Sequence, residues 1–589
     1  MSRRAPGTRR SGGAGLSVEQ RSRRNRAGLI VLVTLLVLVV GRLVVLQGID
    51  GAAYASAAEQ DRLRNYTIAA LRGSVLDRDG SPFAYTVDAS RVVADPTVVG
   101  DPARTALALT TLLDVPVPEL TEKLSADGRY VVLAEQVPPE TADAVEELGL
   151  AGVLLQDNPE RLYPSGTVGG QVVGFVGSEG TGLAGIEHTF EEQLSGTPGR
   201  RTVEVGSGGH PIPSGIDESS PATDGSDVTL TLDQDLQFVT EQRLGEACAD
   251  GATTRASAVV LEVATGRVAA MGSCPGYDPG AYSETDPDLL GNPVVSDVFE
   301  PGSVMKAVTL AAAVEEGHAT PERVMSVNGH IEAGDVVVTD AHDHAPVDWT
   351  VTGILAKSSN VGTIMLAREV GDATLEKYLR AFGVGEKTGI ELPGESRGIL
   401  EGAADWSPSR AANVPIGQGV SVTTLQMASV YQAIANDGMR VEPRIVESVT
   451  DPSGRVAAAP EPARTRVISE ATADAMAYML EAVVGPGGTA PLAQVEGFRV
   501  AGKTGTAQRA NPECNCYAGG GYVTTFVGFA PADDPQYVVA VDLERPTSSA
   551  EGGQVAAPVF ADIMRSALTA DGVVPSGTPR PEFRLTGTP

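Results

Sequence analysis

Hydrophobic and polar positions divide the chain into segments of different character. Residues 1–26 are rich in Arg, Gly and Ser and hold too few apolar residues to form a core, so we expect a disordered tail. Residues 27–47 are almost wholly apolar and long enough for one transmembrane helix. Residues 48–205 alternate short strand-like and helix-like patterns, which predicts a mixed α+β domain.

The second half of the chain predicts a larger domain. Residues 206–227 are rich in Gly, Ser, Pro and Asp with almost no apolar run, which indicates a linker. Within residues 228–570, strand patterns come first, helical patterns fill the middle, and strands return after Val500. We therefore expect an antiparallel sheet assembled from distant segments, with helices around it. The proline-rich residues 571–589 predict a flexible tail.

Charge suggests an orientation for the apolar segment and excludes one class of partner. The basic residues precede the apolar run, which favours a cytoplasmic N-terminus and an extracytoplasmic remainder. The rival interpretation is a cleavable signal peptide, because Ala55-Ser56-Ala57 has the small-x-small form of a cleavage site. The net charge of −31 arises despite the basic tail, which argues against nucleic acid as a partner.

The clearest candidate for chemistry is the stretch from Phe299 to Lys306. Pro and Gly are followed by Ser303 and then by an Ala-rich apolar run, which predicts a loop that leads into a helix. Ser303 and Lys306 are three residues apart and so share one helical face. A desolvated lysine can take the proton of a serine hydroxyl and activate it as a nucleophile. Of the six lysines in the chain, only Lys306 has a serine three residues before it.

In one known type of serine acyltransferase, S-x-x-K is accompanied by two further motifs, S-x-N and K-T-G. Each of these two motifs has two candidate copies in this sequence, so one copy of each is a decoy. For S-x-N, the segment Ser326-Val327-Asn328 runs into an Asn-Gly turn signal, whereas Ser358-Ser359-Asn360 joins two apolar helical patterns. We choose Ser358 and Asn360.

For K-T-G, the candidates are Lys387-Thr388-Gly389 and Lys503-Thr504-Gly505. The first lies among glycines and indicates a turn. The second ends a strand-like run and continues as Thr506-Ala507-Gln508, where a sheet edge would face the serine. We choose Lys503.

These motifs, in this order along the chain, resemble those of class B penicillin-binding proteins, the bitopic peptidoglycan transpeptidases. They are residues 299–306, then Ser358 with Asn360, then residues 503–508. Residues 71–80, Leu-Arg-Gly-Ser-Val-Leu-Asp-Arg-Asp-Gly, resemble the box that opens the N-terminal pedestal, or dimerisation, domain of that family. The segments Arg161–Pro164 and Gly182–Glu187 resemble its later boxes. We assign these boxes, including Arg72 and Asp77, to the scaffold rather than to catalysis.

The resemblance implies a multidomain α+β fold. It consists of a membrane helix, a mixed pedestal, and a penicilloyl serine transferase domain with a five-stranded antiparallel sheet flanked by helices plus an all-helical lobe. It assigns catalytic roles to Ser303, Lys306, Ser358, Asn360 and Lys503, and substrate contacts to Thr504, Gly505 and Thr506. The expected substrates are peptidoglycan stem peptides, and β-lactams would acylate the same serine.

The resemblance favours the septal, cell-division type of transpeptidase over the elongation type. The functions of a β-lactamase, a D,D-carboxypeptidase and a non-catalytic β-lactam-binding scaffold also stay open, since each is compatible with the same motifs. Because no glycan-polymerising motif is apparent before Gly206, we expect a membrane-embedded glycan polymerase and other division proteins as partners.

We expect no metal and no cofactor. The segment Asp340-Ala341-His342-Asp343-His344 contains ligand types but has no further set of ligands nearby, so we interpret it as a loop that borders the active site. The sequence leaves the pairing of its four cysteines open; they are Cys248, Cys274, Cys514 and Cys516.

Overall fold

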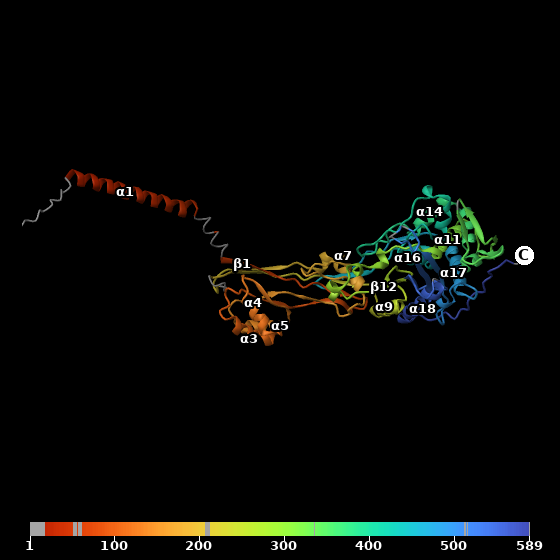
Figure 1. Cartoon of the computed structure of the whole chain (residues 1–589), viewed down its shortest axis with the longest axis horizontal. Helices are drawn as coiled ribbons and strands as arrows, with labels where there is room; N and C mark the ends of the chain where they lie inside the picture. Colours follow the sequence, from red (N-terminus) through yellow and green to blue (C-terminus); the bar gives the residue numbers. More distant parts are fainter. Residues whose placement is uncertain are drawn as a thin grey trace, which may run out of the picture. The chain divides into compact units, whose positions relative to one another are not determined.

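The structure is a computed structural model that divides into two compact units. One unit comprises residues 1–68 and 198–222, and the other comprises residues 69–197 and 223–589. Figure 1 traces the whole chain. The structure describes residues 18–50, 56, 62–206, 212–334, 336–511, 514, 516–549 and 551–587.

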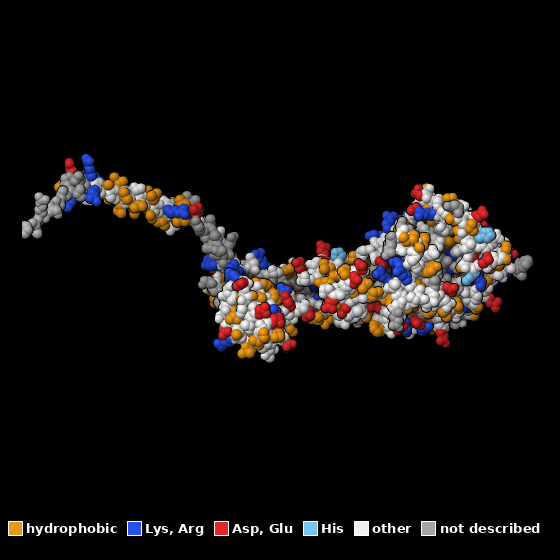
Figure 2. Space-filling model, viewed as in Figure 1, with side chains coloured by type: hydrophobic (Ala, Val, Ile, Leu, Met, Phe, Trp, Pro, Cys, Tyr) orange, Lys and Arg blue, Asp and Glu red, His pale blue; other side chains and the backbone are white. Residues whose placement is uncertain are grey.

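The first unit begins with the apolar helix. Helix α1 (Val18–Val44) continues into a π-helical turn (Val45–Ile49), and the stretch from Arg21 to Gly48 is long and apolar enough to cross a membrane. Figure 2 shows orange hydrophobic side chains along it. The expectation of disorder is wrong for residues 18–26, which are helical, while residues 1–17 lie outside the described part. Ala55 and Ala57 of the possible cleavage site also lie outside it.

The same unit holds a three-stranded antiparallel sheet in the order β1-β8-β9, made of β1 (Leu63–Ile68), β8 (Gly199–Glu204) and β9 (Asp217–Ser220). Strand β9 falls inside the segment predicted to be a linker, so that prediction is wrong for residues 217–220. The physical reason is that β8 offers a free backbone edge, and even polar residues can pair with it. Residues 207–211 lie outside the described part.

The second unit contains a small α+β layer, in agreement with the alternation read from the sequence. Its sheet has the order β5-β4-β6 and is covered by three short helices around a buried aliphatic core. The strands are β4 (Ser90–Ala94), β5 (Val131–Val137) and β6 (Val153–Asp157), and the helices are α3 (Pro102–Leu113), α4 (Val117–Leu124) and α5 (Pro139–Glu147). Figure 1 shows α3, α4 and α5 gathered together.

A six-stranded sheet joins the pedestal sequence to the larger domain, which explains why residues 69–197 belong to the same unit. Its order is β19-β18-β10-β2-β3-β7. The strands are β2 (Val75–Leu76), β3 (Pro82–Val87), β7 (Glu160–Leu162), β10 (Asp227–Leu230), β18 (Val446–Thr450) and β19 (Val456–Ala458).

Beside this sheet lies a buried ionic cluster. Glu187 is fully buried and pairs with both Arg72 and Arg161, at 2.6 and 2.8 Å. Asp77 instead accepts hydrogen bonds from the backbone N–H groups of its own turn. Since removal of one member of a buried pair leaves an uncompensated charge, these box residues stabilise the scaffold.

The five-stranded sheet of the larger domain is fully antiparallel, in the order β12-β11-β23-β22-β21. Its strands are β11 (Arg255–Glu262), β12 (Val268–Cys274), β21 (Ala501–Gln508), β22 (Tyr522–Ala530) and β23 (Tyr537–Glu544). Helices α9 (Gln234–Cys248) and α18 (Gly552–Ala570) pack on one face, and α16 (Thr424–Ala435) packs on the sheet from the other. Helix α16 starts with a capping box between Thr423 and Gln426.

The helical lobe surrounds α11 (Lys306–Glu315), which is apolar and buried along most of its length. The helices around it are α12 (Val351–Ala356), α13 (Asn360–Val370), α14 (Asp372–Ala381) and α17 (Glu470–Val484). Two hairpin-like pairs flank the lobe: β13 (Val324–Val327) with β16 (Val347–Thr350), and β14 (His330–Ala333) with β15 (Val336–Thr339). An all-helical core packed around α11 fits the lobe expected from the sequence.

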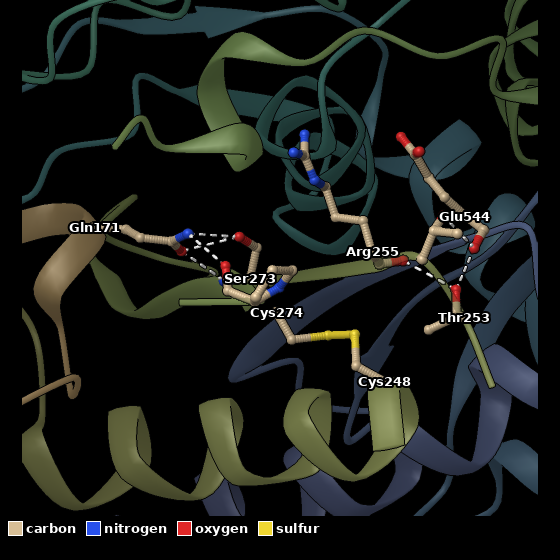
Figure 3. The surroundings of a disulfide bond; sticks show 9 residues. Gln171, Cys248, Thr253, Arg255, Ser273, Cys274 and Glu544 are labelled. Carbon is tan, nitrogen blue, oxygen red and sulfur yellow. Dashed lines mark hydrogen bonds between the residues drawn. A yellow bond between two sulfur atoms is a disulfide. The ribbon is translucent and has the colours of Figure 1, made fainter. Parts of the chain in front are cut away.

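All four cysteines form disulfides. Cys248, at the end of α9, bonds to Cys274, at the end of edge strand β12 (Figure 3), and Cys514 bonds to Cys516 in the loop between β21 and β22. Figure 3 also shows Gln171, whose amide nitrogen donates to Ser273 Oγ at 2.8 Å. The first disulfide thus fastens a helix to the sheet edge that the pedestal residue Gln171 also contacts.

The C-terminal segment is ordered against the helical lobe, so the expected flexible tail is wrong for residues 573–587. The Thr350 N–H donates to Leu585 O at 3.1 Å, and the Gly587 N–H donates to Asp348 O at 2.7 Å. The Phe583 ring lies 5.1 Å from that of Tyr478. The prolines exclude a helix, but they leave backbone groups and apolar side chains that can pair with β16. Residues 588 and 589 lie outside the described part.

Candidate active site

Ser303 lies in a 3₁₀ turn (Gly302–Met305) that leads directly into α11. The turn is pressed against neighbouring backbone. Gly302 has φ +56° and its N–H donates to Gly417 O at 2.9 Å, and a Cβ built at Gly302 would lie only 2.7 Å from Thr506 O. Only glycine combines this dihedral with so close an approach, so Gly302 sets Ser303 beside strand β21.

Lys306 is fully buried one turn after Ser303. Its Nζ donates to Ser358 O at 2.6 Å and to Asn360 Oδ1 at 2.7 Å, and Ser358 Oγ lies 3.3 Å away. Burial lowers the pKa of Lys306 to about 7, against the opposing effect of the Asp340 charge. A substantial fraction of this amine is therefore neutral near pH 7 and can accept a proton.

Ser358 occupies the short junction between α12 and α13. Its φ of +58° is rare for a residue with a side chain and costs on the order of 1–2 kcal/mol, a kind of strain that clusters at active sites. The next residue, Ser359, caps α13 by accepting the Gly362 N–H at 3.0 Å. The cap and the strained dihedral together aim Ser358 at both lysines.

Lys503 reaches the same hydroxyl from the sheet. Its Nζ donates to Ser358 Oγ at 3.0 Å and to Thr504 Oγ1 at 3.1 Å. Burial and the positive charge of Lys306 lower the pKa of Lys503 well below its ordinary value. The K-T-G residues lie inside β21 rather than after it, since the strand runs from Ala501 to Gln508.

Gly505 and Thr506 complete the part of the site that strand β21 forms. A Cβ at Gly505 would lie 2.2 Å from Thr525 Oγ1 and 2.7 Å from Pro301 O, so the small residue lets β21 approach the serine turn. Thr506 is exposed on the strand. Every residue of the predicted site thus lies on one of three adjoining elements, namely the serine turn, the Ser358 junction and β21.

The decoy motifs lie in scaffold positions. Ser326 and Val327 belong to β13, which pairs with β16. The Thr388 hydroxyl donates to Glu395 at 2.6 Å in a local turn. The structure therefore brings together the motif copies that were chosen.

Sequence reasoning missed the role of Asp340 at this site. Its carboxylate accepts the Ser359 hydroxyl at 2.8 Å, the Val361 N–H at 3.0 Å and His344 Nε2 at 2.9 Å. The loop expected to border the site does so, and Asp340 anchors the S-x-N segment. Among the described residues, no three His, Cys, Asp or Glu side chains are grouped to hold a metal ion.

A cavity of about 360 Å³ adjoins the serine turn and was also missed. It is lined by Glu300, Ser407, Ser409, Arg410, Asn413, Gln418, Gly419, Gln508 and Tyr517. Glu300 lies in the serine loop and Gln508 ends β21, so the cavity lies beside both of these elements. These residues come from four separate segments, which no single motif could have indicated.

A serine at a helix start and a lysine one turn later, lying beside an S-x-N junction and a K-T-G edge strand, define the active-serine penicilloyl transferase class. The comparisons with known proteins agree. Residues 256–565 match the penicillin binding protein transpeptidase domain, and residues 67–230 match the penicillin-binding protein dimerisation domain.

Relatives match over nearly the whole chain. Penicillin-binding protein PbpB of Mycolicibacterium smegmatis is 39% identical, with 96% of this chain and 93% of the relative covered. Peptidoglycan D,D-transpeptidase FtsI of Escherichia coli K12 is 33% identical, with 92% and 90% covered. The crystal structure of penicillin binding protein 3 from Mycobacterium tuberculosis, complexed with aztreonam, gives a TM-score of 0.70 at 36% identity, with 89% and 100% covered.

The chain belongs to the class B penicillin-binding proteins. It is a serine-type peptidoglycan D,D-transpeptidase, and its one apolar N-terminal helix fits a single-pass membrane protein.

Proposed function

We propose that Ser303 cross-links peptidoglycan stem peptides at the division septum through an acyl-serine intermediate, and that β-lactams acylate the same residue. The observation that carries this assignment is the fully buried Lys306, one turn from Ser303 and hydrogen-bonded to Ser358 and Asn360. The septal role is supported by the similarity to FtsI and PbpB.

Acylation begins with the neutral Lys306 amine, which takes the Ser303 hydroxyl proton as Oγ attacks the carbonyl carbon of the penultimate D-alanine. The developing oxyanion accepts hydrogen bonds from the backbone N–H groups of Ser303 and Thr506. The peptide C–N bond then breaks, and the terminal D-alanine leaves with the proton, which Ser358 relays from Lys306.

Substrate binding falls to the sheet side of the site. Lys503, with the Thr504 and Thr506 hydroxyls, binds the terminal carboxylate, and Asn360 holds the peptide backbone. Strand β21 is the last strand in the sheet order, so its outer edge suits an extended peptide. In the second half-reaction an amine of a neighbouring stem attacks the ester, the C–O bond breaks, and Ser303 regains its proton.

The basic end of α1 supports a cytoplasmic N-terminus with the catalytic domain outside the membrane. Arg21, Arg23, Arg24 and Arg26 lie at that end. This orientation puts the active site outside the membrane, where stem peptides are joined. A glycan polymerase and other division proteins are the partners that this reaction requires.

The deciding experiment labels the full-length protein in detergent with a fluorescent penicillin and maps the adduct by mass spectrometry. We expect a long-lived adduct on Ser303 that is absent from Ser303→Ala. Rapid loss of the label would indicate a hydrolase instead, and no adduct at all would contradict an acyl-serine intermediate. A lasting adduct on a protein that does not turn over paired stem peptides would indicate a β-lactam-binding scaffold. Release of D-alanine without cross-links from paired stem peptides would indicate a carboxypeptidase.

A further inference from the structure

The last described residues of the chain form a short added strand beside the helical lobe. Thr586 makes an antiparallel bridge with Trp349 of β16, and the Gly587 N–H donates to Asp348 O at 2.7 Å. Strand β13 already pairs with the other edge of β16. We call residues 582–587 the C-terminal strap. The strap thus covers the second edge of β16, and β16 runs directly into helix α12.

Thr350 joins the strap to the first turn of α12. It is fully buried and caps the helix, because its Oγ1 accepts the Gly353 N–H at 2.9 Å. The same hydroxyl donates its proton to Arg584 O at 2.6 Å, and the Thr350 N–H donates to Leu585 O at 3.1 Å. Since a threonine hydroxyl has only one proton to donate, the strap fixes the orientation of the cap.

The strap also lies against the helix itself. A Cβ built at Gly353 would lie 1.9 Å from Leu585 O, far inside van der Waals contact, so the close approach of the strap excludes a side chain at this position. On its other side, the Phe583 ring lies 5.1 Å from that of Tyr478, and the Tyr478 hydroxyl donates to Glu582 O at 3.2 Å. The strap is therefore held between α12 and α17.

Helix α12 is a short link between the strap and the active site. All six of its residues are buried, and at about 1.5 Å per residue it is roughly 9 Å long. At its far end, the Ser358 N–H donates to Leu355 O at 3.1 Å. The Ser358 carbonyl in turn accepts a hydrogen bond from Lys306 Nζ at 2.6 Å. A displacement of α12 therefore moves Ser358 together with the carbonyl that holds Lys306.

We infer that the C-terminal strap is a positioning element of the active site, which acts through Thr350 and α12 to hold Ser358 against the two lysines. The inference rests on the proposed function, in which Ser358 relays a proton. Ser358 has a φ of +58°, and such a strained conformation persists only where the surrounding structure holds it. The Ser358 Oγ lies 3.0 Å from Lys503 Nζ and 3.3 Å from Lys306 Nζ, so a shift of about 1 Å breaks both hydrogen bonds.

The test separates the rate of acylation from the amount of folded protein. Full-length protein in detergent is mixed with an excess of a chromogenic β-lactam in a stopped-flow instrument. The amplitude counts the molecules whose Ser303 can react, and the dependence of the rate on β-lactam concentration gives the noncovalent Kd and the limiting acylation rate. A segment that only stabilises the fold changes the amplitude, whereas a positioning element changes the limiting rate.

Two different changes remove the action of the strap. Deletion of residues 582–589 should lower the limiting acylation rate by roughly tenfold to a hundredfold, the range expected for a misplacement of about 1 Å, while Kd changes by less than about twofold. Gly353→Ala should also lower the limiting rate, because its methyl group displaces the strap without removing any residue. Deletion of residues 588 and 589 alone is the matched control and should leave the rate unchanged.

The combined variant shows whether both changes act through the strap. Gly353→Ala should slow the full-length protein and have no further effect once residues 582–589 are deleted. The inference is overturned if the deletion leaves the limiting rate unchanged, whatever the amplitude, or if the two effects multiply in the combined variant. If the deletion variant does not fold, Gly353→Ala alone decides, and an unchanged limiting rate overturns the inference. A wild-type protein that is not acylated on Ser303 would show instead that the proposed function itself is wrong, and this inference falls with it.

Discussion

The pH dependence of acylation follows from the burial of Lys306, and Asp340 is the residue that tunes it. With a pKa of about 7, the neutral fraction of Lys306 rises from ~10% at pH 6 to ~90% at pH 8. If the neutral amine is the base, the acylation rate should rise about tenfold over that range. Asp340 raises this pKa through its charge, so Asp340→Asn should lower it and make the rise between pH 6 and pH 8 smaller.

The assay is stopped-flow acylation by a chromogenic β-lactam across this pH range, with thermal melting to check the fold. Asp343→Asn is the matched control, because Asp343 is an exposed carboxylate in the same loop that does not act on Lys306. His344 is hydrogen-bonded to Asp340, and this raises the pKa of His344. A His344→Gln variant therefore measures how much the titration of His344 contributes to the pH dependence of the acylation rate. An Asp340→Asn profile that is unchanged, or that moves to higher pH, would refute the reasoning.

Three further predictions follow from buried groups and from the end of the chain. Burial raises the pKa of Asp542 from 3.8 to about 7, so the native state holds a proton that the unfolded state loses, and stability falls as pH rises between these values. The free energy of unfolding of Asp542→Asn relative to wild type should therefore rise between pH 4 and pH 8, by up to about 4 kcal/mol. Urea denaturation at pH 4 and at pH 8 measures this change, and a difference between variant and wild type that is equal at both pH values would contradict the prediction. Phe583→Ala should lower the free energy of unfolding by about 1–2 kcal/mol, because the Phe583 ring packs against Tyr478. An unchanged melting temperature would mean that the C-terminal segment contributes nothing to stability. Lys503→Ala should weaken substrate binding more than the acylation rate at saturating substrate, measured by a split of KM and kcat; an equal loss of that rate in Lys306→Ala and Lys503→Ala would contradict the division of roles.

The sequence was most informative where function depends on local spacing. Ser303 and Lys306 are one helical turn apart, and Ser358 and Asn360 flank a single helix cap, so short motifs were enough to propose them. An antiparallel sheet built from distant segments could be predicted from the apolar strand patterns, whereas its five strands came from the family resemblance. The choice between duplicate motifs depended on what surrounds them, since Lys387 lies among glycines and Lys503 in a strand.

Features set by distant contacts could not be predicted. Strand β9 is polar and forms only because β8 has a free edge. The segment from Pro575 to Gly587 is rich in proline, and its order comes from β16 and from Tyr478, which lie far away in the sequence. Glu300 and Asp340 look like ordinary surface acids until the fold places one beside a cavity and the other beneath the S-x-N junction.

The strand order of the catalytic sheet also fixes when the enzyme can first act as it is synthesised. Strands β11 and β12 are made early, and the chain then supplies Ser303, Lys306 and the whole helical lobe before β21 begins at Ala501. Strand β23, which lies between β11 and β22, comes later still. A nascent chain therefore carries Ser303 long before strand β21, which is proposed to bind the substrate carboxylate, and such non-local pairing forms slowly. The catalytic sheet is therefore incomplete until β23, which ends at Glu544, has been made.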